Sequence, residues 1–154
     1  MQQSARVIES RSVRAAEMNN IAQDRSGDRA LSMLVADDDA SVVRLLVNYA
    51  TRMGFDVDTA SDGIQAFLKV RRAKPNILVI DVNMPEMDGL SVCDHLQDAD
   101  QAPANVILIT GSRHPHTLER CERVGTYWAR KGPNFWNDLT AALAEIDPRV
   151  ALLP

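Results

Sequence analysis

The chain has 154 residues, of which 45% are hydrophobic and 25% charged, a composition typical of a single folded domain with one core. Its formal net charge of −4 gives no reason to expect nucleic-acid binding, and no apolar stretch approaches the roughly 18 residues that span a bilayer. The N-terminus lacks the apolar core of a signal peptide, so we expect a cytoplasmic protein. Cys93 and Cys121 have no CxxC spacing or histidine cluster beside them, and we expect both to be reduced and packed.

The pattern of polar and apolar residues divides the chain into three parts. Residues 1–30 are polar with a broken helical stripe, which predicts a disordered or loosely helical extension more than a docking helix. Residues 31–147 hold all the regular periodic segments and form the predicted globular domain. Residues 148–154 are expected to be a short C-terminal tail.

Short apolar runs that stop at turn-forming or polar residues predict strands, and longer segments with apolar residues every three or four positions predict helices. Asp39 or Ser41 should cap the first helix, and Ser61 the second. Gly54, Pro75 and Pro148 mark the ends of the first, second and last helices. The predicted strands are residues 31–36, 55–59, 77–80, 106–109 and 126–130, each followed by a helix. Five strand–helix repeats predict a parallel sheet covered by helices on both faces.

Reactive side chains follow four of these strands. Asp37 and Asp38 follow the first strand, Asp81 the third, Thr110 ends the fourth, and Lys131 follows the fifth. The carboxyl ends of parallel strands meet at one edge of the sheet, where open α/β sheets bind ligands. Each residue alone is more often structural than functional, but the set is far more specific than any of its members.

Three crowded carboxylates repel one another, and a hard divalent cation would remove the conflict. Mg²⁺ suits this site because it binds one or two carboxylates, keeps waters and shares a phosphate oxygen. Lys131 and the Thr110 hydroxyl could then bind a phosphoryl group, and Asp81 at the centre is the candidate nucleophile.

The motifs LVADDDA, ILVIDVNMPEMDG and VILIT, with a single lysine after the fifth strand, resemble the receiver domain of two-component response regulators. The resemblance covers roughly residues 31–147 in the family's order. It implies a flavodoxin-like five-stranded parallel sheet with strand order 2-1-3-4-5 and helices on both faces.

By this resemblance, Asp81 is the phosphoacceptor, and Asp38 and Asp81 are side-chain ligands of Mg²⁺. Asn83 would contribute its backbone carbonyl, and Asp37 would hold the metal through a water molecule. The metal site of the family therefore maps onto residues that are all present in this chain.

The resemblance also assigns Thr110 as the switch hydroxyl, Lys131 as the phosphate-binding lysine and Trp128 as the aromatic switch residue.

The chain departs from the family's pattern in three places. Gly132 separates Lys131 from Pro133, which leaves a cis peptide in question. Gly111 follows the switch threonine where alanine is common, which should admit more water. The indole of Trp128 exceeds the usual phenol or phenyl ring, so we expect its inward rotamer to be hindered.

The implied function is a stand-alone receiver that accepts a phosphoryl group from a histidine kinase or a histidine phosphotransfer protein. It would not be an enzyme beyond assisting its own phosphorylation and dephosphorylation. Phosphorylation would alter a protein-binding face formed by the fourth helix, fifth strand and fifth helix. Six residues cluster in sequence there: His114, His116, Tyr127, Trp128, Phe135 and Trp136. We expect a monomer or weak dimer with no nucleic-acid or membrane partner.

Three alternatives compete with this interpretation. The chain could be the receiver fragment of a hybrid histidine kinase, or a receiver-like scaffold that takes no phosphate. An aspartate-nucleophile phosphatase is less favoured, since such enzymes need a second acid two residues after the nucleophile and Asn83 stands there.

Overall fold

The computed structural model describes residues 29–152, which form one α/β fold. The strands are β1 (Ser32–Ala36), β2 (Asp56–Ala60), β3 (Ile77–Asp81), β4 (Asn105–Thr110) and β5 (Tyr127–Arg130). The helices are α2 (Ala40–Arg52), α3 (Gly63–Ala73), α4 (Gly89–Asp98), α5 (Pro115–Val124), α6 (Phe135–Ile146) and the short 3₁₀ helix η2 (Pro148–Leu152). All strand pairs are parallel in the order β2-β1-β3-β4-β5, which confirms the predicted flavodoxin-like topology.

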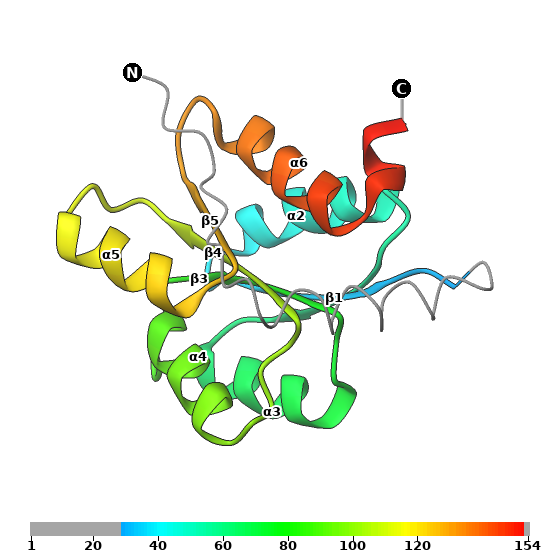
Figure 1. The fold of residues 1–154 in the computed structure, drawn as a ribbon. Coiled ribbons are helices and arrows are strands. Elements are labelled where there is room, and N and C mark those ends of the chain that lie inside the picture. The colour runs from blue at the N-terminus through cyan, green and yellow to red at the C-terminus, as the bar shows by residue number, and fades with distance from the viewer. Residues whose placement is uncertain (1–28, 153–154) are drawn as a thin grey trace.

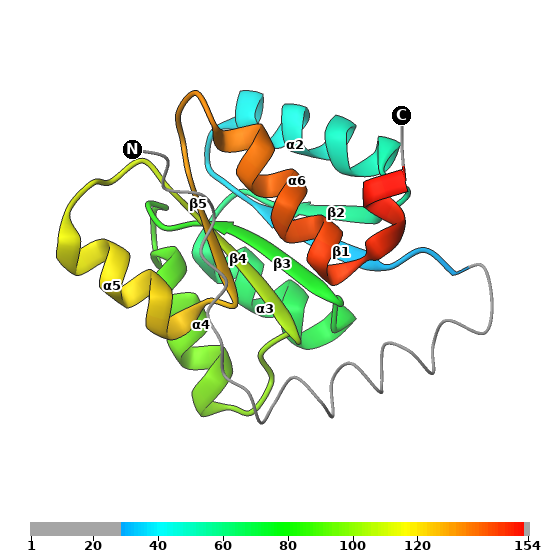
Figure 2. The same cartoon turned by 45° about the horizontal axis from the view of Figure 1, so that its top comes forward.

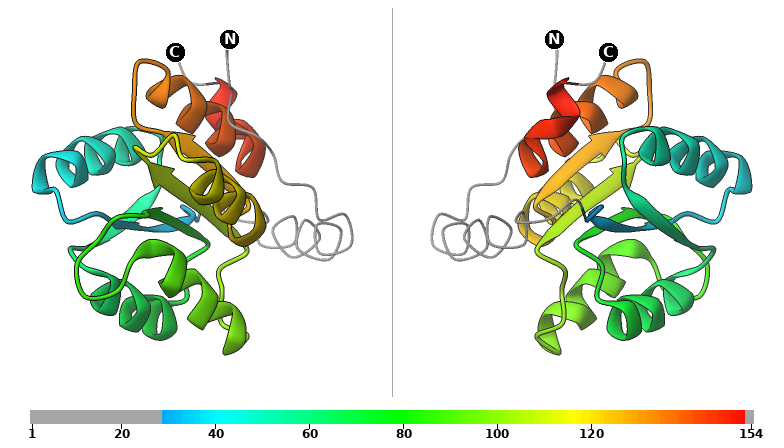
Figure 3. Two further views of the ribbon diagram at one scale, coloured as in Figure 1. Left: turned by 90° about the vertical axis from the view of Figure 1, so that its left-hand side faces the viewer. Right: turned by 90° about the vertical axis from the view of Figure 1, so that its right-hand side faces the viewer.

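The helices cover the sheet on both faces (Figures 1, 2 and 3). Helices α2 and α6 pack on one face, and α3, α4 and α5 pack on the other. None of the helices between residues 29 and 152 is long and apolar enough to cross a membrane.

Alternate residues of the strands supply two separate cores because successive side chains point to opposite faces of a sheet. On β3, Ile77 and Val79 join the core beneath α2 and α6, whereas Leu78 and Ile80 join the core beneath α3, α4 and α5. The strand is buried along its whole length, which explains its continuous apolar run. The polar Asp81 at its end is therefore held at the border of the core.

Helix starts follow local capping rules. The Asp39 carboxylate caps α2 by accepting a hydrogen bond from the Ser41 backbone N–H at 2.9 Å. Asp62, and not the predicted Ser61, caps α3 through the Gln65 N–H. The Ser61 N–H instead donates to the Gln65 side-chain oxygen at 2.7 Å, which completes a reciprocal capping arrangement.

The C-terminal region contains one element that the sequence patterns did not reveal. Helix η2 continues the chain after α6 and buries Val150 against the core shared by α2 and α6. The Arg149 guanidinium pairs with the buried Asp147 carboxylate at 2.7 Å. Pro148 therefore ends α6 as predicted, but the residues that follow it pack on the domain. The predicted extension lies almost entirely in residues 1–28, outside the described residues.

Candidate functional site

Three carboxylates converge at the carboxyl edge of the sheet. Asp37 and Asp38 follow β1, and Asp81 is the last residue of the neighbouring strand β3. Each can offer an oxygen atom within 4.8 Å of an oxygen from the other two. Asp37 and Asp81 are only 1% and 4% exposed, whereas Asp38 is exposed to solvent. The structure thus brings together the acidic residues that the strand ends predicted.

Lys131 lies between the two buried members of this acidic cluster. Its Nζ is 3.2 Å from Asp37 Oδ2 and 3.3 Å from Asp81 Oδ2. The Lys131 backbone N–H donates to the Thr110 carbonyl at 2.8 Å, which fixes the start of this loop against β4. The lysine therefore bridges two carboxylates from different strands.

The electrostatics of the cluster favour an added positive charge. Burial, and then the nearby charge of Asp37, raise the pKa of Asp81 to about 6, although Lys131 and a backbone hydrogen bond from Asn83 oppose the shift. For Lys131, burial lowers the pKa, but the charges of Asp81 and Asp37 outweigh it and raise the pKa overall. One ammonium group therefore does not fully offset the cost of the buried carboxylates.

Gly89 controls the backbone position of Asp81. The Gly89 N–H donates to the Val82 carbonyl at 2.9 Å, and a Cβ on Gly89 would lie 2.2 Å from the Asp81 carbonyl oxygen. Only glycine permits this approach of α4 to the end of β3. Gly89 was not among the predicted site residues; its signal in the sequence is a poor helix former at the first position of a helix.

Thr110 is the last residue of β4, the strand next to β3, and has no exposed surface. Its Oγ1 accepts a hydrogen bond from the Ser112 N–H at 3.0 Å, so the hydroxyl proton remains able to donate. No atom lies within 4 Å of the position that a Cβ on Gly111 would occupy. The space around Gly111 is therefore open, whereas Thr110 itself is fully buried, so the expected entry of more water stays a prediction.

Trp128 is buried in the core beneath α3, α4 and α5, with only 4% of its surface exposed. It pairs with Leu108 across the sheet and packs in the same core as Leu118 of α5. The core therefore accommodates a buried indole at position 128, and the expected hindrance of a switch rotamer near Thr110 stays a prediction. The indole Nε1 is buried and has no hydrogen-bond partner within residues 29–152.

Trp136 does not lie on the predicted switching face. Its ring packs against Tyr49 of α2 with a centroid separation of 5.0 Å, and the Tyr49 hydroxyl is hydrogen-bonded to Thr140. Tyr127 is also buried, in the core beneath α2 and α6. Phe135 packs in that core as well. Among the four Tyr, Trp and Phe residues predicted for the α5–β5–α6 face, only Trp128 lies in the core that includes α5, because neighbouring residues of β5 point to opposite faces.

The loop from β5 to α6 departs from the family pattern without a cis bond, as all peptide bonds in the described part of the chain are trans. The Phe135 N–H donates to the Gly132 carbonyl at 3.1 Å, which closes a turn over Pro133. The inserted glycine therefore leads into a compact turn before α6.

A groove of about 720 Å³ lies between α5 and this loop. Its lining is mixed in charge and contains both Trp128 and Lys131. The other lining residues are Arg113, Pro115, Leu118, Glu119, Glu122, Arg130, Gly132, Pro133, Asn134 and Asp138. This α5–loop groove connects the phosphate-binding lysine predicted from the sequence with the α5–β5–α6 face.

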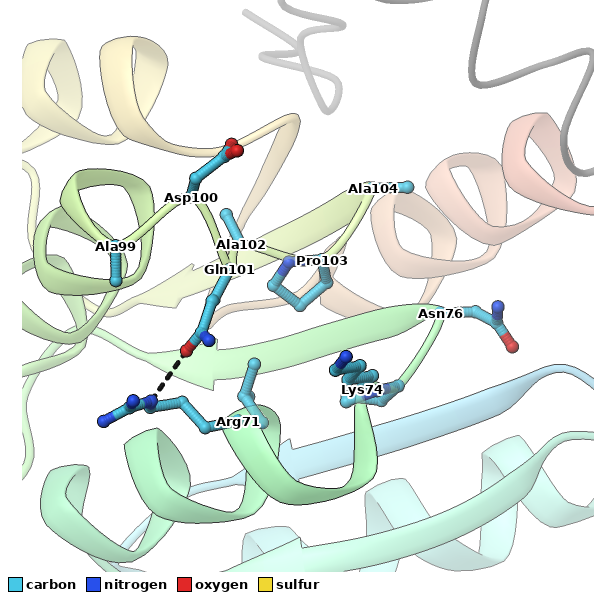
Figure 4. A pocket seen from close by; sticks show the side chains of 11 residues that line it. Arg71, Lys74, Asn76, Ala99, Asp100, Gln101, Ala102, Pro103 and Ala104 are labelled. Atoms are coloured by element: carbon cyan, nitrogen blue, oxygen red, sulfur yellow. Dashed lines mark hydrogen bonds between the residues drawn. The ribbon is translucent and has the colours of Figure 1, made fainter.

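A second cavity, of about 470 Å³, lies at the opposite, amino edge of the sheet (Figure 4). It is formed by the end of α3 and the segments that precede β3 and β4. Arg71 there donates to the Gln101 side chain at 2.6 Å, the contact drawn in Figure 4. No member of the acidic cluster borders this cavity, so the chemistry predicted from the sequence belongs to the carboxyl edge.

Comparisons with known proteins agree with this geometry. Residues 33–128 match the model of the response regulator receiver domain. The chain is 37% identical over 92 residues to a probable transcriptional regulator, ycf27, of Pyropia yezoensis, which covers 60% of this chain and 35% of that protein. It is 46% identical over 65 residues to the regulatory protein PhoP of Bacillus subtilis, covering 42% of this chain and 27% of PhoP.

The chain thus spans about a quarter to a third of the length of these curated relatives. Among solved structures, a CheX–CheY–BeF3–Mg complex from Borrelia burgdorferi superposes with a TM-score of 0.67 at 25% identity, covering 75% of this chain and 88% of that one. Receiver domains are signalling modules of two-component systems. The match over most of the folded residues, together with the topology and the acidic edge, shows that this chain belongs to the response regulator receiver domain family.

Proposed function

We propose that this chain is a phosphoacceptor that receives a phosphoryl group from a partner's phosphohistidine onto Asp81. The observation that supports this proposal is the cluster of Asp37, Asp38 and Asp81 with Lys131 bridging its two buried members. Burial of a carboxylate beside another carboxylate has no evident structural benefit. It is understandable where a reaction needs the charge.

In the proposed transfer, an Asp81 carboxylate oxygen attacks phosphorus, and the bond from phosphorus to the histidine nitrogen breaks. The partner's imidazole keeps the electron pair of that bond and is protonated as it leaves. Lys131 can then stabilise the negative phosphoryl oxygens, since its ammonium group already lies 3.3 Å from Asp81. Positioning and charge compensation are the main contributions a protein makes to such a reaction.

The donor set fits Mg²⁺. Carboxylate and carbonyl oxygens are its preferred protein ligands, and the cluster offers oxygens from three carboxylates within 4.8 Å of one another. We assign Asp38 and Asp81 as direct ligands, Asn83 as a carbonyl ligand and Asp37 as a ligand through water. When bound, Mg²⁺ would neutralise charge on the carboxylates and on the phosphoryl oxygens.

The readout would begin at Thr110, whose hydroxyl can donate to a phosphoryl oxygen on Asp81. A displacement of Thr110 would change the loop that leads to α5, and with it the α5–β5–α6 face. The partners would be a histidine kinase or a histidine phosphotransfer protein upstream and an output protein at that face. Apart from assisting its own phosphorylation and dephosphorylation, the domain would not be an enzyme.

Intact mass spectrometry after incubation with Mg²⁺ and acetyl phosphate tests this proposal. The chain should gain one phosphate that hydroxylamine removes, because an acyl phosphate is labile to this nucleophile. Asp81→Asn should gain none, whereas Asp100→Asn at the amino edge should behave as the wild type. Failure of the wild type to gain a labile phosphate, or an equal gain by Asp81→Asn, would refute the assignment.

A further inference from the structure

The loop from β3 to α4, residues 82–88, carries Asn83 beside the candidate phosphoacceptor. The Gly89 N–H donates to the Val82 carbonyl at 2.9 Å, which brings the two ends of the loop together. A backbone hydrogen bond from Asn83 opposes the rise in the pKa of Asp81, so this part of the loop contacts the Asp81 carboxylate. The position of the loop therefore determines where the Asn83 backbone lies relative to Asp81.

A strained turn lies within this loop. The Met87 N–H donates to the Pro85 carbonyl at 2.8 Å, and Glu86 between them has a φ of +68°. This is the pattern of a γ-turn with a positive central φ, which is rare and unfavourable for a residue other than glycine. Such a conformation persists only where the surrounding structure holds it in place. The exposed Glu86 side chain cannot supply that support, so the backbone beside it must be held from outside the loop.

The start of α3 makes a close contact with this turn. Gly63 is the first residue of α3 and is buried. A Cβ on Gly63 would lie 1.8 Å from the Met87 carbonyl oxygen and 2.6 Å from its carbonyl carbon. Both are backbone atoms, so no change of a side-chain rotamer would relieve the overlap. Helix α3 can therefore lie against the turn because residue 63 has no side chain.

The first turn of α3 is itself anchored, so a side chain at position 63 would displace the loop more readily than the helix. The Asp62 carboxylate caps α3 by accepting from the Gln65 N–H at 2.7 Å, and Ala66 is fully buried in the core beneath α3, α4 and α5. Among the glycines of residues 29–152, Gly63 and Gly89 approach other backbone atoms most closely. Both approaches fix the segment that runs from Asp81 to α4.

We propose that Gly63 is a positioning residue for the phosphoryl-transfer site, because it lets α3 hold the loop in the place where Asn83 can offer its carbonyl oxygen to Mg²⁺. This inference rests on the proposed function, since it adds a determinant of metal binding to the same site. Mg²⁺ demands a near-ideal octahedral set of oxygens and tolerates a displaced ligand poorly. A side chain at position 63 should therefore weaken metal binding more than it disturbs the rest of the fold.

Isothermal titration calorimetry of the full chain with MgCl₂ tests this proposal, at a temperature where circular dichroism shows each variant to be folded. Gly63→Ala should raise the dissociation constant for Mg²⁺ about tenfold or more. The matched control is Gly125→Ala, whose new Cβ would also overlap with its neighbours, at 2.8 Å from a side-chain carbon of Leu108, but at the opposite edge of the sheet. It should lose stability and keep the wild-type dissociation constant.

Phosphorylation by acetyl phosphate provides a second readout that separates positioning from a general loss of structure. For Gly63→Ala, the Mg²⁺ concentration that gives the half-maximal rate should rise in step with the dissociation constant, while the rate at saturating Mg²⁺ should fall much less. Gly125→Ala should keep the half-maximal concentration of the wild type. An equal loss of rate for Gly63→Ala at every Mg²⁺ concentration would contradict a positioning role.

A wild-type dissociation constant in folded Gly63→Ala would overturn this inference alone. If Gly63→Ala does not fold, Asp62→Ala takes its place, because it removes the cap of α3 and loosens the contact while position 63 stays glycine. It should weaken Mg²⁺ binding about threefold, and an unchanged value would overturn the proposal. Failure of the wild type to bind Mg²⁺ or to gain a labile phosphate would instead refute the proposed function, and this inference with it.

Discussion

The two edges of the sheet both carry charged residues around a depression, yet they differ in how those charges are held. At the carboxyl edge, Asp37 and Asp81 are buried and share one ammonium group. At the amino edge, Arg71 and Asp100 are exposed, and Arg71 is satisfied by Gln101 (Figure 4). The carboxyl edge stores unfavourable electrostatic energy, whereas solvent screens the charges of the amino edge. Both edges have a cavity, so a cavity alone does not tell them apart. The buried like charges of Asp37 and Asp81 occur at the carboxyl edge and mark it as the candidate site.

The largest expected contrast concerns glycines at the two edges. Gly89→Ala should destabilise the fold by about 3 kcal/mol, because the new Cβ would lie 2.2 Å from the rigid Asp81 carbonyl oxygen. Gly125→Ala, just before β5, should cost less, about 1–2 kcal/mol, since its closest atom is a side-chain carbon of Leu108 at 2.8 Å and its closest backbone atom, the Tyr127 carbonyl oxygen, lies farther away at 3.0 Å. Urea unfolding of both variants measures the difference. Equal losses would show that the backbone of Asp81 is not tightly held.

In the metal-free protein, the titration of Asp81 should make the free energy of unfolding depend on pH. The pKa of Asp81 in the folded chain, about 6, lies above its ordinary value of 3.8, so the contribution of Asp81 to stability is greatest below the ordinary value and is lost as the pH rises through 6. Asp81→Asn removes this loss and should be more stable than the wild type by about 2–3 kcal/mol at pH 7.5, but not at pH 4. Unfolding curves at both pH values test this, and Asp100→Asn should follow the wild type at each.

The site at the carboxyl edge could largely be predicted from the sequence. Once the parallel strand order is known, the strand ends place Asp37, Asp81 and Thr110 together. The roles of aromatic residues could not be predicted in the same way. In β5, both faces are buried, so alternation alone does not say whether Tyr127 or Trp128 points towards α5. Helix α6 begins with two adjacent aromatic residues, and only the contact with Tyr49 shows which way Trp136 turns.

The burial of Asp138 and the 3₁₀ helix η2 could not be predicted from the sequence, for a related reason. An acidic residue in the first turn of a helix is normally a response to the helix dipole, so its sequence position gives no sign of burial. Similarly, a proline after a helix marks an end and does not reveal whether the following residues, here around Val150, pack back on the core. Both features depend on contacts between segments that are distant in sequence.

Added Mg²⁺ should stabilise the wild type through the carboxyl edge alone. At about ten times its dissociation constant, a ligand that binds only the folded state adds about 1.4 kcal/mol. Asp38→Ala should remove most of this gain without changing the metal-free stability much, because Asp38 is exposed. Asp100→Ala is the matched variant at the amino edge and should keep the full gain. Thermal unfolding with and without Mg²⁺ gives both values, and an equal gain in Asp38→Ala would exclude Asp38 as a ligand.

The smallest expected contrast compares one cation from each edge. Lys131→Ala should reduce stability at pH 7.5 by about 1 kcal/mol, a modest loss because the side chain is partly exposed and screened. It should weaken phosphorylation much more. Arg71→Ala should change neither, since its guanidinium is exposed and bonds a neutral amide. A larger loss of stability for Arg71→Ala than for Lys131→Ala would contradict the proposed difference between the two edges.

The central claim is that Asp81 itself carries the phosphoryl group, and reductive trapping tests it most directly. Borohydride reduces an aspartyl phosphate to homoserine but leaves free carboxylates intact, so peptide mass spectrometry can locate the modified residue. After treatment with Mg²⁺ and acetyl phosphate, we expect homoserine at position 81 in the wild type and unmodified aspartate at positions 37, 38 and 100. Homoserine at position 37 or 38, or at none of the four in protein that has gained a phosphate, would contradict the account.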